Sequence, residues 1–121
     1  MREERLRSTS GLRGTPALAL SAWRGRSGRR YVVGVHELIE PDLDGMGDAV
    51  VIAVRRDGAG VAEPVSVTST SEGPRERLLR NWLTRARHHG ATEMHVHRLA
   101  ESEDERRAIV ADLDAEPAGW A

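Results

Sequence analysis

The chain of 121 residues is 39% hydrophobic and 31% charged, a composition that fits one globular domain and leaves no room for a second. It contains no cysteine, so neither a disulfide framework nor a thiolate metal site is available, and no apolar run approaches the roughly 18 residues of a membrane span. The N-terminal sequence M-R-E-E-R-L-R-S-T-S-G-L-R-G is polar and charged, unlike a signal peptide. We expect a soluble, cytoplasmic protein.

All eighteen basic residues are arginine, and lysine and phenylalanine are absent, which reflects coding pressure from a GC-rich genome as much as selection by a partner. The arginine count alone therefore says little about nucleic-acid binding. Its distribution says more, because residues 1–35 contain eight arginines and two acids, whereas residues 99–121 contain seven acids and two arginines. The net charge of −1 thus conceals a polarised chain.

Residues 1–15 show no apolar period and are predicted to form a mobile N-terminal tail, ahead of a single domain over residues 16–114 and a C-terminal tail over residues 115–121. Residues 17–23 and 29–39 are predicted to form a hairpin around the turn R-G-R-S-G.

Two further strands are predicted after a loop over residues 40–48. Residues 49–55, A-V-V-I-A-V-R, are apolar at both alternating positions, which predicts a central strand covered on both faces. Residues 61–70 contain Pro64, which cannot donate to a ladder and so favours an edge position.

A helix is predicted from Gly73-Pro74 to about His88, since proline suits a first turn and Gly90 lies just past the last one. Its buried stripe is predicted to consist of Leu78, Leu79, Trp82, Leu83 and Ala86.

The last two predicted elements are a strand and a helix. Residues 93–97 predict a strand with Met94 and Val96 on its apolar face and with His95 and His97 on a solvated face. Ser102 and Glu105 then predict a capping box for the last helix. The fold predicted is α+β, a small, mainly antiparallel sheet with two packed helices in the order β-β-(β-β-α-β-α).

The second half of the chain contains two sequences that resemble the GIY-YIG nuclease-like superfamily. W-L-T-R-A-R-H-H-G-A-T-E-M-H-V-H, followed by R-R-A-I-V-A-D-L, is similar to one bacterial branch, in which a Trp-bearing helix enters a G-A-T-H-type strand and an I-E-x-D-L-type helix. The resemblance extends over residues 27–113 and implies a GIY-YIG-like core.

The resemblance also implies that the catalytic groups of this superfamily are missing here. Active members have a tyrosine on each of the first two core strands, an arginine on the next helix and a metal-binding glutamate on the last helix. D-A-V-V-I-A-V and E-P-V-S-V-T-S-T contain no tyrosine, and Val110 takes the glutamate position, while Arg77 or Arg75 fits the arginine position. Valine can neither bind a metal nor accept a proton, so we expect a degenerate domain without nuclease activity.

Two metal hypotheses are weak. His95 and His97 point the same way on a strand, but no cysteine or clear carboxylate accompanies them. Glu40, Asp42 and Asp44 imitate the start of a calcium loop, yet Val51 stands where a bidentate glutamate is needed. We therefore expect no metal ion and no cofactor.

Arginines beside aromatic residues are the remaining signal of function. Trp23 and Tyr31 lie next to the hairpin arginines, a combination that suits phosphate contact and base stacking. The candidate nucleic-acid-binding residues are Arg24, Arg26, Arg29, Arg30, Arg77 and Arg80. The alternatives are a protein-interaction or regulatory module with no nucleic-acid role and, third, a residual metal-dependent nuclease.

Overall fold

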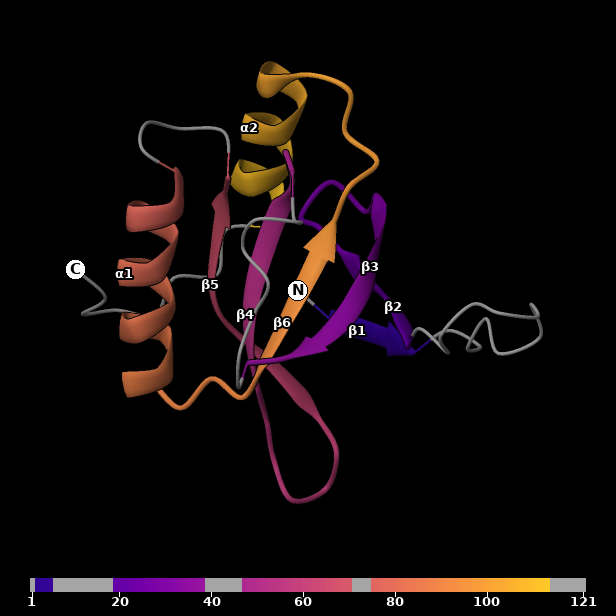
Figure 1. Ribbon diagram of the computed structural model, residues 1–121. Coiled ribbons are helices and arrows are strands. Elements are labelled where there is room, and N and C mark those ends of the chain that lie inside the picture. Colours follow the sequence, from indigo (N-terminus) through magenta and orange to yellow (C-terminus); the bar gives the residue numbers. More distant parts are fainter. Residues whose placement is uncertain (1, 6–18, 39–46, 71–74, 114–121) are drawn as a thin grey trace, which may run out of the picture.

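The computed structural model describes residues 2–5, 19–38, 47–70 and 75–113 (Figure 1). Its elements, in chain order, are β1 (Arg2–Arg5), β2 (Leu20–Arg24), β3 (Arg30–Glu37), β4 (Val50–Arg56), β5 (Ala62–Ser69), α1 (Arg75–His88), β6 (Glu93–His97) and α2 (Glu103–Asp112).

The described strands form one antiparallel sheet in the order β1-β2-β3-β6-β4-β5. β6 pairs with β3 on one side and β4 on the other, and so joins the β2–β3 hairpin to the β4–β5 hairpin. The prediction of an α+β fold with a small antiparallel sheet and two packed helices is confirmed.

The prediction of a tail over residues 1–15 was wrong for residues 2–5, which form β1 and pair with β2. R-E-E-R has no apolar alternation, and its position depends on contacts with distant parts of the chain. Residues 1 and 6–15 of the predicted N-terminal tail and the whole predicted C-terminal tail, residues 115–121, lie outside the described residues.

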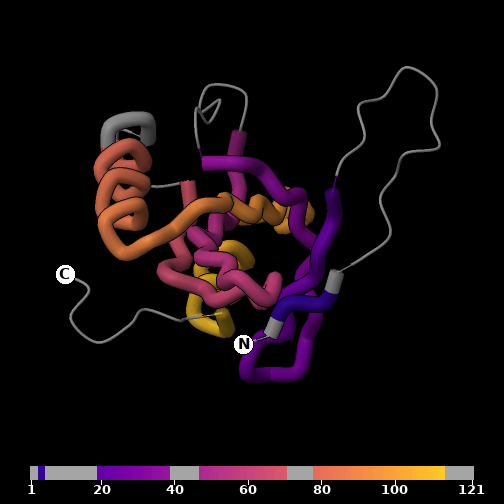
Figure 2. Tube along the Cα trace, turned by 90° about the horizontal axis from the view of Figure 1, so that it is seen from below, coloured from indigo at the N-terminus to yellow at the C-terminus, as the bar shows by residue number. Residues whose placement is uncertain are grey.

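The sheet curls so that its first and last strands, β1 and β5, approach each other. Figure 2 shows the strands gathered around the core, with α1 outside them. α2 lies across one end of the curl and contributes Ile109 and Leu113 to the inner cluster. The strand residues of that cluster are Trp23, Tyr31, Val33, Val50, Ile52, Val54 and Val67.

α1 covers the outer face of β4 and β6. Leu79 and Leu83 pack on Val51, Met94 and Val96 in a second apolar cluster, as the predicted stripe requires. One member of that stripe was predicted wrongly: Leu78 is 50% exposed, because it lies at the rim of the contact.

β4 is buried along its first five residues and lies inside the sheet, which confirms the predicted central strand. β5 is the last strand of the sheet, which confirms the edge position predicted from Pro64. The register shifts beside this proline: Ala53 is opposite Ser66, whereas Val54 is opposite Pro64, so Val65 is the extra residue of a bulge.

The N-terminus of α2 is capped as predicted by Ser102, whose side chain accepts a hydrogen bond from the backbone N–H of Glu105 at 3.1 Å. The reciprocal bond differs from a standard capping box, because the Glu105 carboxylate accepts from the backbone N–H of Glu101 rather than from that of Ser102.

Arg56, the last residue of β4, holds together three strands. Its guanidinium contacts the carboxylate of Glu3 on β1 at 3.0 Å and that of Glu93 on β6 at 2.6 Å. All three side chains are largely buried, at 14%, 7% and 17% exposure for Arg56, Glu3 and Glu93. β1 is therefore fixed to the curled sheet by a buried ion pair.

His95 extends this network, and the prediction that His95 and His97 lie on a solvated face was wrong. Both are buried, because β6 lies in the middle of a sheet whose inner face forms the core. Trp23 Nε1 donates to His95 Nδ1 at 2.9 Å, so the proton of the neutral ring is on Nε2, which donates to Glu93 at 2.9 Å.

We expect Arg56→Met to lower the free energy of unfolding by about 3–5 kcal/mol, because it leaves two largely buried carboxylates without their positively charged partner. Arg55→Met is the matched control, since the Arg55–Glu63 pair is exposed and such pairs are worth about 1 kcal/mol or less. Adding Glu3→Gln and Glu93→Gln to Arg56→Met should recover much of the loss. Urea unfolding measures all three effects, and a loss with Arg56→Met no larger than the control's would contradict the assigned role.

Candidate functional site

Two of the predicted arginines lie side by side on the outer face of the sheet. Arg24 on β2 is opposite Arg30 on β3, and the Cα of Arg2 on β1 is opposite that of Arg24. The side chains of Arg24 and Arg30 are about half exposed, and both contact the carboxylate of Glu4, at 3.4 and 2.6 Å. One acid thus offsets part of the charge of this pair.

The other two hairpin arginines lie in the turn between β2 and β3. Arg26 and Arg29 are exposed, and the guanidinium carbon of Arg29 is 5.7 Å from the centre of the Tyr31 ring. Together with Arg24 and Arg30 they place four arginines at one end of a hairpin, where the carboxylates of Glu4 and Asp112 also lie. Among these described residues, positive charge is in excess.

Asp112, at the end of α2, fixes the conformation of this turn. Its carboxylate accepts hydrogen bonds from the backbone N–H and the hydroxyl of Ser27, at 2.8 and 2.7 Å, and from the Tyr31 hydroxyl at 2.7 Å. Bonds from Ser27 and Tyr31 lower the pKa of Asp112, while burial and the bond to Asp112 raise the pKa of Tyr31. A Cβ at Gly25 would lie 2.1 Å from an Asp112 oxygen, so a larger residue there would displace this carboxylate.

The aromatic half of the predicted site is wrong. Trp23 is fully buried and Tyr31 is 4% exposed, since both point into the curled sheet rather than toward the arginines of the outer face. Neither ring is available to stack on a base. Strand alternation was the available signal, because it places Trp23 and Tyr31 on the face opposite to that of Arg24 and Arg30.

The two predicted arginines of α1 do not join the hairpin group. Arg80 is exposed on α1, and Figures 1 and 2 show α1 on the side of the molecule away from the β2–β3 hairpin. The side chain of Arg77 lies outside what the structure describes. The six predicted residues therefore do not form one face.

The structure places no catalytic carboxylate at the position implied by the nuclease resemblance. Val110 is partly buried against the inner cluster, and Asp112 is occupied by the β2–β3 turn. Within the described parts of the chain, no group of three or more His, Asp or Glu side chains is arranged to hold a metal ion.

The described residues of the two metal hypotheses have partners within the protein. His95 is fully buried with Trp23 and Glu93 as partners, and His97 is bonded to the backbone oxygen of Val32 at 2.7 Å. Of the calcium-like loop, Glu40, Asp42 and Asp44 lie outside the described residues, while Asp48 faces Arg106 at 3.9 Å.

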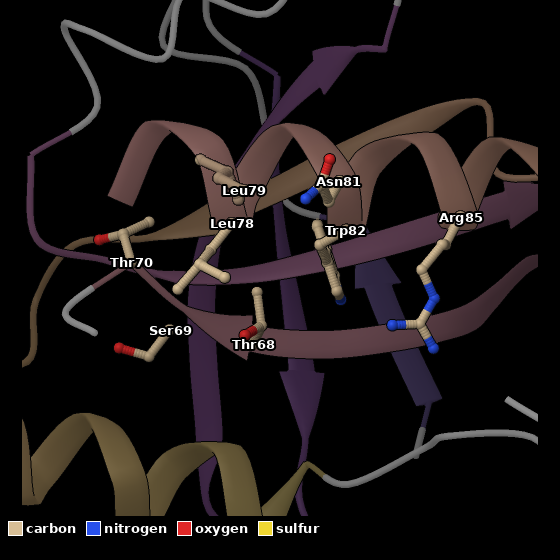
Figure 3. Close-up of a pocket in the computed structure, with 8 residues that line it drawn as sticks. All are labelled: Thr68, Ser69, Thr70, Leu78, Leu79, Asn81, Trp82 and Arg85. Atoms are coloured by element: carbon tan, nitrogen blue, oxygen red, sulfur yellow. The ribbon is translucent and has the colours of Figure 1, made fainter. Parts of the chain in front are cut away.

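A groove between β5 and α1 was missed by sequence reasoning. Its volume is about 370 Å³, and Figure 3 shows Leu78, Trp82 and Arg85 along the helix above Thr68 of β5 and Thr70, which follows the end of β5. Trp82 Nε1 donates to Ser66 Oγ at 2.9 Å and fixes the helix to the strand. The sequence signal for this groove was the apolar stripe of α1. Periodicity predicts which residues belong to that stripe, but it does not reveal that Leu78, at its edge, stays exposed to solvent.

No protein-family model, curated protein or solved structure matches this chain. The likeness to the GIY-YIG superfamily thus stays a prediction. Neither α1 nor α2, the helices of the described residues, is long and apolar enough to cross a membrane.

We expect the free energy of unfolding to fall as the pH drops below about 6.5, the ordinary value for histidine. Burial lowers the pKa of His95, so acid protonates this ring in the unfolded chain before it does so in the folded one. Burial and Arg98 lower the pKa of His36 in the same direction. The hydrogen bond from Arg56 lowers the pKa of Glu93 from 4.5 to about 2. The free energy of unfolding should therefore fall further as the pH drops from 4.5 to about 2.

Urea unfolding at a series of pH values measures this dependence. His95→Gln should flatten the slope below pH 6.5, whereas the exposed His88→Gln serves as control and should keep it. A slope unchanged by His95→Gln would show that this ring does not titrate differently in the two states.

Proposed function

We propose that this chain is a non-catalytic, GIY-YIG-like domain of the cytoplasm that binds nucleic acid through the arginines of its β2–β3 hairpin. The observation that supports this most is the gathering of Arg24, Arg26, Arg29 and Arg30, all exposed, at one end of a turn that Asp112 fixes. A fixed turn reduces the conformational entropy that binding costs.

The expected mode is contact with phosphates. Arginine forms paired hydrogen bonds with phosphate oxygens, and such contacts carry little sequence information. With Trp23 and Tyr31 buried, the hairpin offers no ring of its own for base stacking. Binding should therefore be insensitive to sequence and strongly weakened by salt.

The proposal includes no nuclease activity, because the two tyrosines and the glutamate of the resembled nucleases have no counterpart here. β4 and β5 contain no tyrosine, and Val110 packs toward the core where the resembled nucleases have a metal-binding glutamate. A residual nuclease is the least favoured alternative, because hydrolysis would lack both a metal ligand and a base.

Interaction with a protein is the second candidate function. The observation that favours it is the open edge of β5 beside the groove under α1. Unpaired strand edges are a common place for an extended partner segment to add.

Fluorescence anisotropy with labelled single-stranded and duplex DNA tests the first proposal. Affinity should fall steeply with salt, and the double variant Arg24→Ala/Arg30→Ala should weaken binding about tenfold or more at low salt and reduce the salt slope by about 2. Arg26→Ala/Arg29→Ala should act in the same direction.

The matched control is Arg55→Ala/Arg107→Ala, which removes the same charge from two exposed ion pairs elsewhere. A loss of affinity equal to that of the hairpin variants would mean that only the net charge matters. No binding at low salt would overturn the proposal.

A further inference from the structure

The turn between β2 and β3 holds a carboxylate in the way that a binding site holds an anion. Three donors converge on Asp112: the backbone N–H of Ser27 at 2.8 Å, the Ser27 hydroxyl at 2.7 Å and the Tyr31 hydroxyl at 2.7 Å. Both hydroxyls donate to the same oxygen, Oδ2. Donors that converge in this way suit the oxygens of a phosphate as well as those of a carboxylate. We call these three donors the oxyanion cradle.

The cradle is built into the fold. Tyr31 is 4% exposed and belongs to the inner apolar cluster, so its hydroxyl is held in place by a fixed ring. Gly25 lies directly against the carboxylate, because a Cβ there would be 2.1 Å from Oδ2 of Asp112. A glycine at such a position lets an anion approach the backbone closely. The cradle is therefore formed in advance, which reduces the entropy that binding costs.

The surroundings of the cradle favour a negative charge. Hydrogen bonds from Ser27 and Tyr31, and after them the charge of Arg29, lower the pKa of Asp112. The guanidinium carbon of Arg29 lies 5.7 Å from the centre of the ring whose hydroxyl is part of the cradle. A phosphodiester has the same charge as a carboxylate and the same number of free oxygens. It can therefore accept the same hydrogen bonds in place of Asp112.

The carboxylate of Asp112 can leave the cradle while the end of α2 stays in place. The helix end is held separately, because the Arg26 N–H donates to the Asp112 carbonyl at 3.0 Å and Leu113 is fully buried in the inner cluster. The Asp112 residue itself is partly exposed to solvent. A change of rotamer at this one side chain is thus enough to open the cradle.

We infer that the oxyanion cradle is a phosphodiester site of the nucleic-acid surface, and that Asp112 occupies it as an internal competitor when no nucleic acid is bound. An occupant on the same chain has a high effective concentration, so a single free phosphate does not displace it. A nucleic-acid strand does, because other residues of the hairpin bind its further phosphates at the same time. The inference rests on the proposed function, and it makes Asp112 a selector for polyanions over small anions.

The first test adds inorganic phosphate to the ¹⁵N-labelled full chain at constant ionic strength and follows the amide signal of Ser27. In Asp112→Ala, phosphate should shift this signal saturably, whereas the native chain should need at least about tenfold more phosphate. Adding Gly25→Ala to Asp112→Ala fills the cradle with a methyl group and should abolish the shift. Adding Gly58→Ala instead is the matched control, since a Cβ there meets nothing within 4 Å. Neither glycine has a positive φ, so both backbones accept alanine.

A second variant covers the case in which Asp112→Ala does not fold. Asp112→Asn keeps the shape of the side chain and removes its charge, so phosphate should displace it more easily than it displaces the native carboxylate. An absence of saturable phosphate binding in the folded variants would overturn the inference. A shift that Gly25→Ala leaves intact would do the same, because the phosphate would then lie outside the cradle.

The second test measures DNA affinity by fluorescence anisotropy at low salt. Asp112→Ala should raise the affinity about tenfold, because it removes the competitor. Asp104→Ala is the matched control, since it removes the same charge from the exposed first turn of α2, and it should change the affinity by less than about twofold. Tyr31→Phe should weaken binding about tenfold in the Asp112→Ala background and within about twofold in the native chain, where both competing occupants lose the same bond.

Failure of the inference is distinguishable from failure of the proposed function. DNA binding that requires the hairpin arginines but gains no more from Asp112→Ala than from Asp104→Ala would overturn the inference and leave the proposed function standing. Phosphate binding by Asp112→Ala with no DNA binding by any variant would overturn both, because the cradle would then accept a free phosphate and not a nucleic acid.

Discussion

The contact of Arg56 with Glu3 and Glu93 is the constraint on which the rest of the structure depends. It joins the end of β4 to the first strand and to β6, and it continues through His95 to Trp23 on β2. A four-residue strand of sequence R-E-E-R has no apolar side chain to hold it in place. Since an isolated buried charge is costly, loss of one partner destabilises the others, and the network ties β1 to β4 and β6 across the curl.

The curl decides which side chains face solvent. It turns Trp23 and Tyr31 inward and leaves Arg24 and Arg30 on the outer face. α1 covers the outer face only over β4, β5 and β6, so the β2–β3 hairpin keeps its own surface. The hairpin end and the β5–α1 groove are therefore two separate surfaces on one scaffold.

Much of the fold could be predicted from local patterns. A-V-V-I-A-V-R is apolar at both parities, Pro64 is incompatible with an inner strand and Ser102 is a strong N-cap, so these elements follow from the residues themselves. Their bounds lie within a few residues of those predicted.

The failures concern contacts between distant residues. Glu3 and Arg56 are 53 positions apart, and nothing local marks β1 as a strand. The alternation of Met94 and Val96 with histidines indicates one apolar face, but β6 is buried on both because Trp23 and Glu93 satisfy His95. The inward position of Trp23 follows a local rule instead, because neighbours in a strand such as Trp23 and Arg24 point to opposite sides.

Binding by the β2–β3 hairpin is tested most directly by nuclear magnetic resonance of a ¹⁵N-labelled sample titrated with single-stranded DNA. We expect DNA to shift amide signals of residues 24–30 and to leave those of residues 66–69 and 78–85 in place. Shifts spread over both sets of residues, or no shifts at all, would contradict the account.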